Sequence, residues 1–188
     1  TDPVAAVNAE ANDEGRAYLF LGSASGLATT AAWEVDPTDT TLANFGQSVA
    51  CAGDVNGDGF SDVVVGSWGW WDGVSFVSEG RAYLFLGTSA GLQTTAAWTA
   101  DPNDQTGARF GYSVSGAGDV NGDGFSDVIV GSMWWDGEAA DEGRAHLFLG
   151  SSRGLSPAPS WNTDPTDQLN GQFGNAVVPA MVEAVGAE

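Results

Sequence analysis

The stretch Asp-Val-Asn-Gly-Asp-Gly-Phe-Ser-Asp, residues 54–62, recurs without change at residues 119–127. Oxygen-bearing side chains occupy positions 1, 3, 5 and 9 of both copies, and glycine at position 6 permits the positive φ of a tight turn. Position 7 is a phenylalanine, whose backbone carbonyl is a further oxygen ligand. Hard divalent cations prefer such an oxygen shell, so we predict two Ca²⁺ ions per chain. The predicted ligands are Asp54, Asn56, Asp58, Phe60, Asp62, Asp119, Asn121, Asp123, Phe125 and Asp127.

The repeated stretch has two other interpretations. An EF-hand requires a bidentate Glu at position 12 and a helix on either side, but position 12 is Val65 or Val130. Each loop instead leads into a β-branched run typical of a buried strand. An Asx-rich turn without metal stays open as an alternative, because Asp, Asn and Gly are ordinary turn residues.

The composition limits the classes of partner. The 188 residues include 25 acidic residues and 5 Lys or Arg, for a formal charge of -20, which disfavours nucleic acid and anionic membrane surfaces. Two bound Ca²⁺ would reduce that charge to -16. No apolar run is long enough for a membrane helix, and no signal segment begins the chain, so we expect a soluble, mature or excised chain without membrane insertion. The single cysteine, Cys51, is expected to be a small core residue.

Internal repetition predicts the architecture. Gly-Arg-Ala-Tyr-Leu-Phe-Leu-Gly begins at Gly15 and Gly80, and a copy with His in place of Tyr begins at Gly143. A Phe-Gly pair follows at the same distance from the start of every copy, at Phe45, Phe110 and Phe173. Together with the four strands assigned below, a period of roughly 65 residues indicates a β-propeller blade.

Four strands can be assigned within one repeat, at about residues 45–50, 62–66, 81–86 and 96–99. The second and third are apolar on both faces, so each small sheet is expected to be covered on both sides, and no segment has a helical period. The predicted fold is all-β, with β-propeller blades of four antiparallel strands and about three blades per chain. We treat 1–188 as one unit, with partial blades at 1–35 and 173–188 and full blades at 45–99 and 110–162.

The incomplete ends of the chain suggest a partner. We expect the first segment to supply the third and fourth strands of a blade. Residues 173–178 would supply a first strand and residues 181–186 a second. Two copies joined head to tail would then form a homodimer that closes a six-bladed ring, within the usual range for propellers. A rival interpretation is a fragment excised or designed from a longer propeller.

The order Phe-Gly, Gly-Asp-Val-Asn-Gly-Asp-Gly-Phe-Ser-Asp and Val-Val-Gly resembles the FG-GAP repeat of integrin α-subunit propellers. The resemblance covers nearly the whole chain. It implies calcium loops between the first two strands of each blade, ligand contacts on the opposite face of the disc, and an extracellular or secreted location. The chain departs from the pattern at the Gly-Ala-Pro triplet, which is replaced by residues 66–68 (Gly-Ser-Trp) and 131–133 (Gly-Ser-Met).

Aromatic residues and length variation both concentrate in the loop between the second and third strands. Such a loop is a candidate binding surface. The candidate ligand-binding residues are Trp68, Trp70, Trp71, Asp72, Trp134, Trp135 and Asp136. The alternative is that these tryptophans are packed between blades. Trp33, Trp98 and Trp161, one in each fourth strand, are expected to be structural.

The function predicted from these features is a calcium-stabilised, non-enzymatic recognition module that binds carbohydrate or protein through its Trp-rich loops. A purely structural, self-assembling propeller unit without ligand is the alternative. An enzyme is a third possibility, but the single histidine, His146, replaces the Tyr18 and Tyr83 of the sister repeats and is expected to be a strand residue. The sequence carries no nucleophile motif, so no catalytic residue is assigned.

Overall fold

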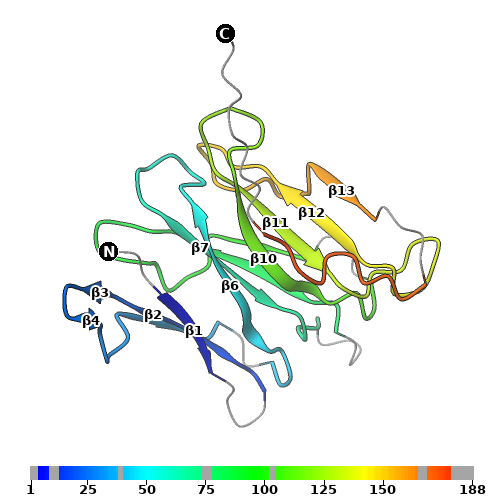
Figure 1. The fold of residues 1–188 in the computed structure, drawn as a ribbon, viewed down its shortest axis with the longest axis horizontal. Coiled ribbons are helices and arrows are strands. Elements are labelled where there is room, and N and C mark those ends of the chain that lie inside the picture. The colour runs from blue at the N-terminus through cyan, green and yellow to red at the C-terminus, as the bar shows by residue number, and fades with distance from the viewer. Residues whose placement is uncertain are drawn as a thin grey trace.

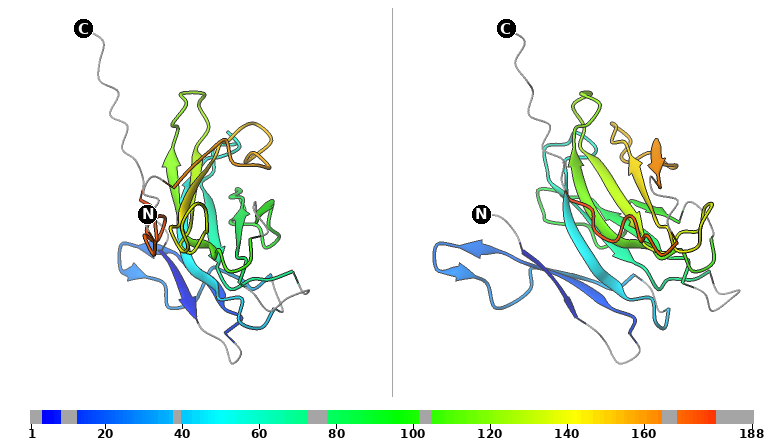
Figure 2. Two further views of the ribbon diagram at one scale, coloured as in Figure 1. Left: turned by 90° about the vertical axis from the view of Figure 1, so that its right-hand side faces the viewer. Right: turned by 45° about the vertical axis from the view of Figure 1, so that its right-hand side comes forward.

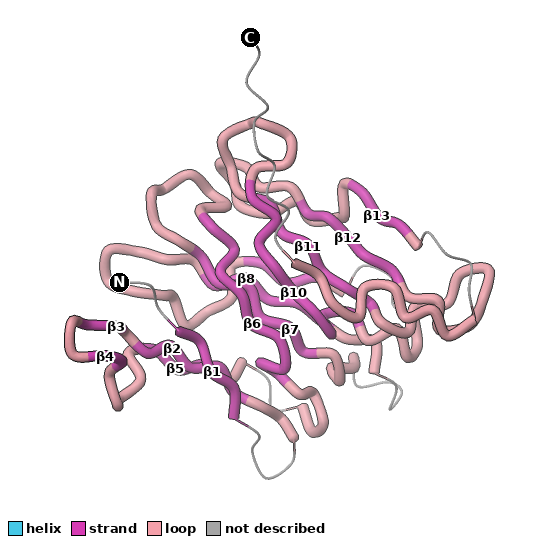
Figure 3. Tube along the Cα trace, in the orientation of Figure 1, coloured by secondary structure: helices cyan, strands magenta, loops and turns pink. Residues whose placement is uncertain are grey.

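A computed structural model describes residues 4–8, 13–37, 40–72, 78–101, 105–164 and 169–178 of the chain, residues 4–8 by their backbone alone. All of these residues lie in strands, turns and loops (Figure 3). Among them there is no helix that could cross a membrane. The expected tail strand at 181–186 lies outside the described residues.

Three antiparallel sheets follow one another along the chain, and in Figure 1 they run from the lower left to the upper right. The first sheet has the order β1-β2-β5, formed by β1 (Val4–Asn8), β2 (Arg16–Phe20) and β5 (Trp33–Val35), with a small hairpin of β3 (Gly22–Ser23) and β4 (Gly26–Leu27). The second sheet is formed by β6 (Phe45–Gly53), β7 (Asp62–Ser67), β8 (Arg81–Phe85) and β9 (Trp98–Ala100). The third is formed by β10 (Phe110–Gly118), β11 (Asp127–Ser132), β12 (Arg144–Phe148) and β13 (Trp161–Thr163).

The two four-stranded antiparallel sheets confirm the predicted all-β fold and its strand order. Every residue of β7 is buried, as the apolar run 62–66 predicted, because neighbouring sheets cover both of its faces. Side-by-side packing of the sheets is plain in the two turned views of Figure 2. In contrast, β2 alternates between buried and half-buried residues, since it lies in the first sheet of the series.

Both expectations for the end segments were wrong in detail. The first segment forms three strands rather than two, because Val4–Asn8 pairs with β2 in the register that β7 keeps with β8, with Val4 opposite Phe20 as Val63 is opposite Phe85. Residues 173–178 form turns and a single bridge instead of a first strand. A first strand normally pairs with the second strand of its own blade, and no such partner stands beside this segment in the described residues.

A recurring bridge joins each sheet to the next and explains why the Phe-Gly pair keeps a constant distance from the Gly-Arg-Ala motif. Gly15, Gly80 and Gly143 each form a parallel bridge with the phenylalanine of the following Phe-Gly pair. The glycine is required here, because Gly15 has φ 87° and a Cβ atom on it would lie 2.1 Å from the Phe45 carbonyl oxygen. The Phe-Gly pair therefore begins a new sheet while still attached to the preceding one.

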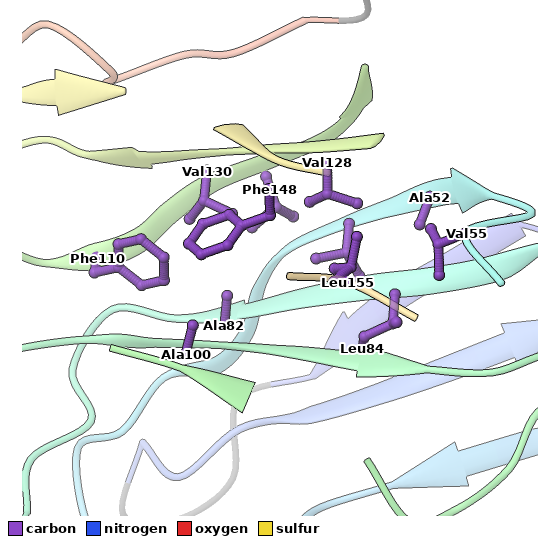
Figure 4. Close-up of a cluster of buried hydrophobic side chains, with 12 residues drawn as sticks. Ala52, Val55, Ala82, Leu84, Ala100, Phe110, Val128, Val130, Phe148 and Leu155 are labelled. Carbon is purple, nitrogen blue, oxygen red and sulfur yellow. The ribbon is translucent and has the colours of Figure 1, made fainter. Parts of the chain in front are cut away.

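Two hydrophobic clusters lie between the sheets. The cluster between the second and third sheets contains Phe110, Phe148 and Leu155, facing Leu84 and Val55 (Figure 4). The other lies between the first and second sheets and includes Trp33, Phe45 and Phe85. The prediction that Cys51 is a core residue was wrong, since its side chain is exposed on β6.

Candidate functional site

The first repeated loop connects β6 to β7 and curls around one carboxylate. Asp54 Oδ1 accepts hydrogen bonds from the backbone N–H of Gly57 (2.7 Å) and Asp58 (3.0 Å), and Asp54 Oδ2 accepts one from Gly59 (2.8 Å). Gly57 and Gly59 have φ of 75° and 89°, which lets three successive amides point inward. The loop is thus shaped by its own first aspartate.

The third and fifth positions of the loop are brought together with the first. Asn56 Oδ1 accepts from the Asp58 N–H at 3.0 Å, and the Asn56 side-chain amide donates to Asp58 Oδ2 at 2.9 Å. Asp58 Oδ1 also accepts from the Phe60 N–H at 2.9 Å. The second loop repeats each of these bonds at residues 119–125, with nearly the same distances.

Asp62, the ninth position, has a different environment. Its side chain is fully buried, and its two oxygens accept the backbone N–H groups of Val55 (2.9 Å) and Gly87 (2.8 Å). Asp127 makes the same pair of bonds, to Val120 and Gly150. Burial raises the pKa of the Asp62 carboxyl, and these amide donors oppose that shift. Asp62 thereby fixes the loop to the turn that follows β8.

The donor chemistry of the loops fits a hard cation. Asp54 Oδ2 and both oxygens of Asp58 each accept one hydrogen bond and keep a second lone pair, and the amide of Asn56 adds a neutral oxygen. Within the described residues, no three Asp, Glu, His or Cys side chains converge closely enough to hold a metal by themselves. A bound ion would therefore need Asn56 and a backbone carbonyl, such as that of Phe60, as well as the aspartates.

The Trp-rich loops follow β7 and β11, so they stand at the other end of the strands that the candidate cation loops precede. In Figure 1 the loops at 54–61 and 119–126 project along the upper edge of the sheets, away from the ends of β7 and β11. The candidate cation loops and the candidate ligand loops thus occupy opposite faces of the row of sheets.

Arginines cover the tryptophans of these loops. The guanidinium carbon of Arg81 lies 3.4 Å from the centre of the Trp70 ring, and that of Arg144 lies 3.2 Å from Trp135. Arg81 also forms an ion pair with Asp101, as does Arg144 with Asp164. The arginines of the second and third Gly-Arg-Ala motifs therefore link a Trp loop to the segment after the fourth strand, a role that the sequence prediction missed.

Arg109 joins the Trp loops of two sheets. Its guanidinium carbon lies 3.3 Å from the centre of the Trp134 ring and 4.4 Å from that of Trp68. Burial lowers the pKa of Arg109 below its ordinary value. This stack supports the packing alternative for Trp68 and Trp134, because cation–π contacts of partly buried groups stabilise the arrangement of neighbouring elements.

The acidic candidates near the tryptophans are exposed. Asp136 is held by Gln105, which donates to the Asp136 carbonyl and accepts from its N–H, both at 2.8 Å. Asp136 Oδ1 also accepts from the Asp141 N–H at 2.7 Å, which closes the loop on itself. Asp72 precedes residues 73–77, which lie outside the described part of the chain.

His146 is a residue of β12, as its place at the position of Tyr18 and Tyr83 predicted, and it lies opposite Val130. It is fully buried, with its Nε2 atom 3.1 Å from the Ser132 hydroxyl, and its ring meets Phe110 edge to face as Tyr83 meets Phe45. Burial, assisted by the nearby Arg144 charge, lowers the pKa of His146 to about 3. The ring is therefore neutral inside the folded protein at ordinary pH.

The neutral state of His146 predicts a pH effect on stability. Because the folded pKa lies below the unfolded value near 6.5, stability is complete above pH 6.5 and falls by about 1.4 kcal/mol per pH unit below it. His146→Tyr, which installs the sister residue, should remove this part of the loss. Urea unfolding at pH 7.5 and 4.5 should show a wild-type loss about 2–3 kcal/mol larger than that of the variant. Equal losses in both proteins would contradict the assignment.

A cavity of about 320 Å³ lies between the first and second sheets and was not predicted from the sequence. Leu19, Leu21, Val49, Cys51 and Leu92 contribute to its lining. In the next interface along the chain, Val55 and Leu155 pack into the hydrophobic cluster. Within the described residues, no counterpart of Val55 occupies the corresponding position between the first and second sheets.

A comparison with known protein families finds one repeat family at two places in this chain. The sequence profile of the FG-GAP repeat matches residues 45–85 and 110–148, which are the first three strands of the second and third sheets. Integrin alpha-4 of Xenopus laevis is 29% identical over 144 residues, covering 77% of this chain and 13% of that protein. Integrin alpha-2 of Mus musculus is 31% identical over 145 residues (72% and 12%), and integrin alpha-IIb of Homo sapiens 36% over 119 residues (63% and 11%). The chain spans about an eighth of the length of these relatives.

Proposed function

Since this chain belongs with the FG-GAP repeat proteins of the integrin α type, we propose that it is a calcium-stabilised, non-enzymatic recognition module that binds carbohydrate or protein. The observation that carries the proposal is the placement of two oxygen-rich loops and two Trp-rich loops at opposite ends of β7 and β11. A cation would stiffen one face, and a ligand would bind at the other.

In this proposal one Ca²⁺ is held by Asp54, Asn56, Asp58 and the Phe60 carbonyl, and a second by the same four positions of the other loop. Asp62 and Asp127 are the ninth-position ligands predicted from the sequence. Each of these carboxylates also accepts two backbone N–H groups, one from its own loop and one from the turn after the third strand of its sheet. An ordered loop would therefore hold that turn in place as well. Calcium would thereby stabilise the whole sheet and not the loop alone.

The ligand face would combine the edges of the tryptophans with charged groups around them. Guanidinium groups cover one face of Trp70, Trp134 and Trp135, and all three residues are half-buried, so part of each side chain would be accessible to a ligand. Aromatic surface beside acidic acceptors suits both sugar rings and protein side chains. A non-catalytic role is supported by the burial of His146, whose ring cannot reach a substrate. We place the protein outside the cell or in a secreted form by analogy with its relatives.

One observation favours a second candidate function, a structural unit without ligand. The arginine stacks already use the tryptophans as packing surfaces within and between sheets. If packing is their whole role, the same residues would contribute stability and no binding.

A glycan array and a panel of extracellular-matrix proteins, probed with calcium and with chelator, separate these candidates. We expect binding in calcium that is lost when Trp134 and Trp135 are both changed to Ala. The melting temperature of that variant should fall by only a few degrees, because a cation–π contact contributes about 0.5–2 kcal/mol. Trp98→Phe serves as the control, since this residue lies in β9 away from the loops and should alter stability without altering binding. No binding on either panel would favour the structural unit.

A further inference from the structure

Tryptophans of the fourth strands make the same contacts with the following sheet. Trp33 donates its indole N–H to the Gln93 carbonyl at 2.9 Å and meets the Phe85 ring edge to face at 5.2 Å. Trp98 repeats the contact one sheet further on, with the Ser156 carbonyl at 3.0 Å and the Phe148 ring at 4.9 Å. The chain therefore uses the same pair of contacts at both of its internal sheet interfaces.

The third tryptophan of the series lacks this environment. Trp161 of β13 is 49% exposed, whereas Trp33 is 7% exposed. The calcium loops differ in the same way. Val55 is fully buried, and its carbonyl accepts the Ser151 N–H at 3.0 Å, but the matching Val120 is 38% exposed. The outer face of the third sheet thus carries an apolar surface that two earlier copies bury against a following sheet.

The complementary surface lies at the other end of the molecule. The repeat period places Phe20 at the position of Phe85 and Ala28 at that of Gln93, and the register of β1 with β2 agrees with this alignment. Ser23 likewise corresponds to Ser151. On this face Leu27 is 54% exposed, although its counterpart Leu155 in the third sheet is 7% exposed. Figures 1 and 3 show β13 and the β3-β4 hairpin on opposite sides of the molecule.

We infer that the outer face of the third sheet docks onto the first sheet of a second copy of this chain. In this contact Trp161 would donate its indole N–H to the partner copy's Ala28 carbonyl and pack on its Phe20 ring. Val120 would lie beside Ser23 of the second copy and cover Leu27. The second copy is the occupant because both halves of a contact that the chain makes twice internally are present, unpaired within the described residues, on one molecule.

The symmetry of this contact has a geometric consequence. The contact joins two different faces of the chain, so each added copy leaves one face of either kind free. Copies therefore continue to add until the rotation between neighbours closes a ring. Each copy contributes three sheets, and two copies contribute six, a number at which propellers close. Two chains of charge -20 repel each other, so association should strengthen when salt is added. The inference depends neither on calcium nor on a ligand, and its test is run both with calcium and with chelator.

Native mass spectrometry and light scattering of the wild-type chain at micromolar concentration in moderate salt give the first test. We expect a species of twice the 19.3 kDa chain mass. A ladder of longer species would overturn closure by two copies but retain the docking contact. A monomer at that concentration would overturn the inference and leave both faces for another protein.

Two single variants identify the faces. Trp161→Ala on one face and Leu27→Ser on the other should each weaken association about thirtyfold or more, because each removes an apolar side chain that the contact would bury. Both side chains are about half exposed in the single chain, so its melting temperature should not change. Leu42→Asn, at a turn residue of equal exposure outside both faces, is the control and should leave the dimer intact.

A mixture of the two variants distinguishes loss of the docking contact from misfolding, because a misfolded variant would not regain association in the mixture. Each variant keeps one intact face, so an equimolar mixture should form a heterodimer through one native contact, more stable than either variant alone. Persistence of wild-type dimer in both single variants, or failure of the mixture to associate although both variants remain folded, would show that other surfaces are used.

Discussion

Removal of calcium should lower the melting temperature of the protein by about 6–20 °C. For loop affinities of about 10⁻⁴ to 10⁻³ M and about 10 mM Ca²⁺, linkage contributes about 1.4–2.7 kcal/mol per site, or about 3–5 kcal/mol for two sites. One kcal/mol corresponds to about 2–4 °C for a chain of this size. The physical reason is the repulsion among the aspartates of each loop, which is worth about 4 kcal/mol for two charges about 4 Å apart near a protein surface.

Differential scanning calorimetry with calcium and with excess chelator measures this effect. Asp58→Asn combined with Asp123→Asn keeps an acceptor for the Phe60 and Phe125 N–H groups and removes one ligand charge from each loop, so the calcium-dependent shift should shrink to a small fraction. Asp13→Asn with Glu138→Gln removes two charges elsewhere and should preserve the shift. An unchanged melting temperature in chelator, with metal loss verified, would leave the loops as Asx turns without a cation.

Gly66→Ala should destabilise the fold by about 3 kcal/mol or more. A Cβ atom on this buried β7 residue would lie 2.0 Å from the Gly111 carbonyl oxygen and 2.3 Å from the Ser48 hydroxyl. The first contact is with backbone of the next sheet, which cannot move aside as a flexible side chain can, so the cost lies at or above the upper end of the range for overpacking. Gly131 has the same environment, with the Gly174 carbonyl oxygen at 1.9 Å.

Chemical unfolding of Gly66→Ala beside Gly91→Ala tests this packing. Gly91 has φ 112° and no atom within 4 Å of a Cβ position, so its substitution carries only backbone strain, about 1–2 kcal/mol. We expect the first variant to lose far more stability than the second. Equal losses would mean that β7 and β10 do not approach each other as closely as the structure shows.

Much of the fold could be predicted because the repeats align position by position. The apolar runs at 62–66 and 81–85, with turn residues between them, predict the strands β7 and β8 and their burial on both faces. The ends were harder, because strand formation there depends on a partner strand that the local sequence does not encode. Residues 173–178 match Phe45–Ala50 in pattern, yet only Phe45–Ala50 has β7 to pair with.

In the candidate site, contacts within one loop could be predicted from the sequence, whereas contacts between repeats could not. Loop geometry follows from Asp54 and its two glycines, all within one short stretch of chain. The arginine stacks do not, since Arg109 meets Trp68 from a separate repeat and nothing in the spacing indicates that contact. For the stacks of Arg81 and Arg144, the available signal was that three of the chain's five basic residues, all of them arginines, recur in Gly-Arg-Ala motifs.

The glycine–phenylalanine bridge between sheets has a consequence for how the chain reaches its native register. The correct bridge from Gly15 reaches Phe45. A bridge to the chemically equivalent Phe110 would close a loop about three times as long, which loop-closure entropy disfavours by only about 1 kcal/mol, so mispaired blades are accessible kinetic traps during folding. Vectorial synthesis reduces that risk, because the first Phe-Gly pair leaves the ribosome before its competitor exists. Refolding from denaturant, where all three pairs are present at once, should therefore be slower and more heterogeneous than folding during translation.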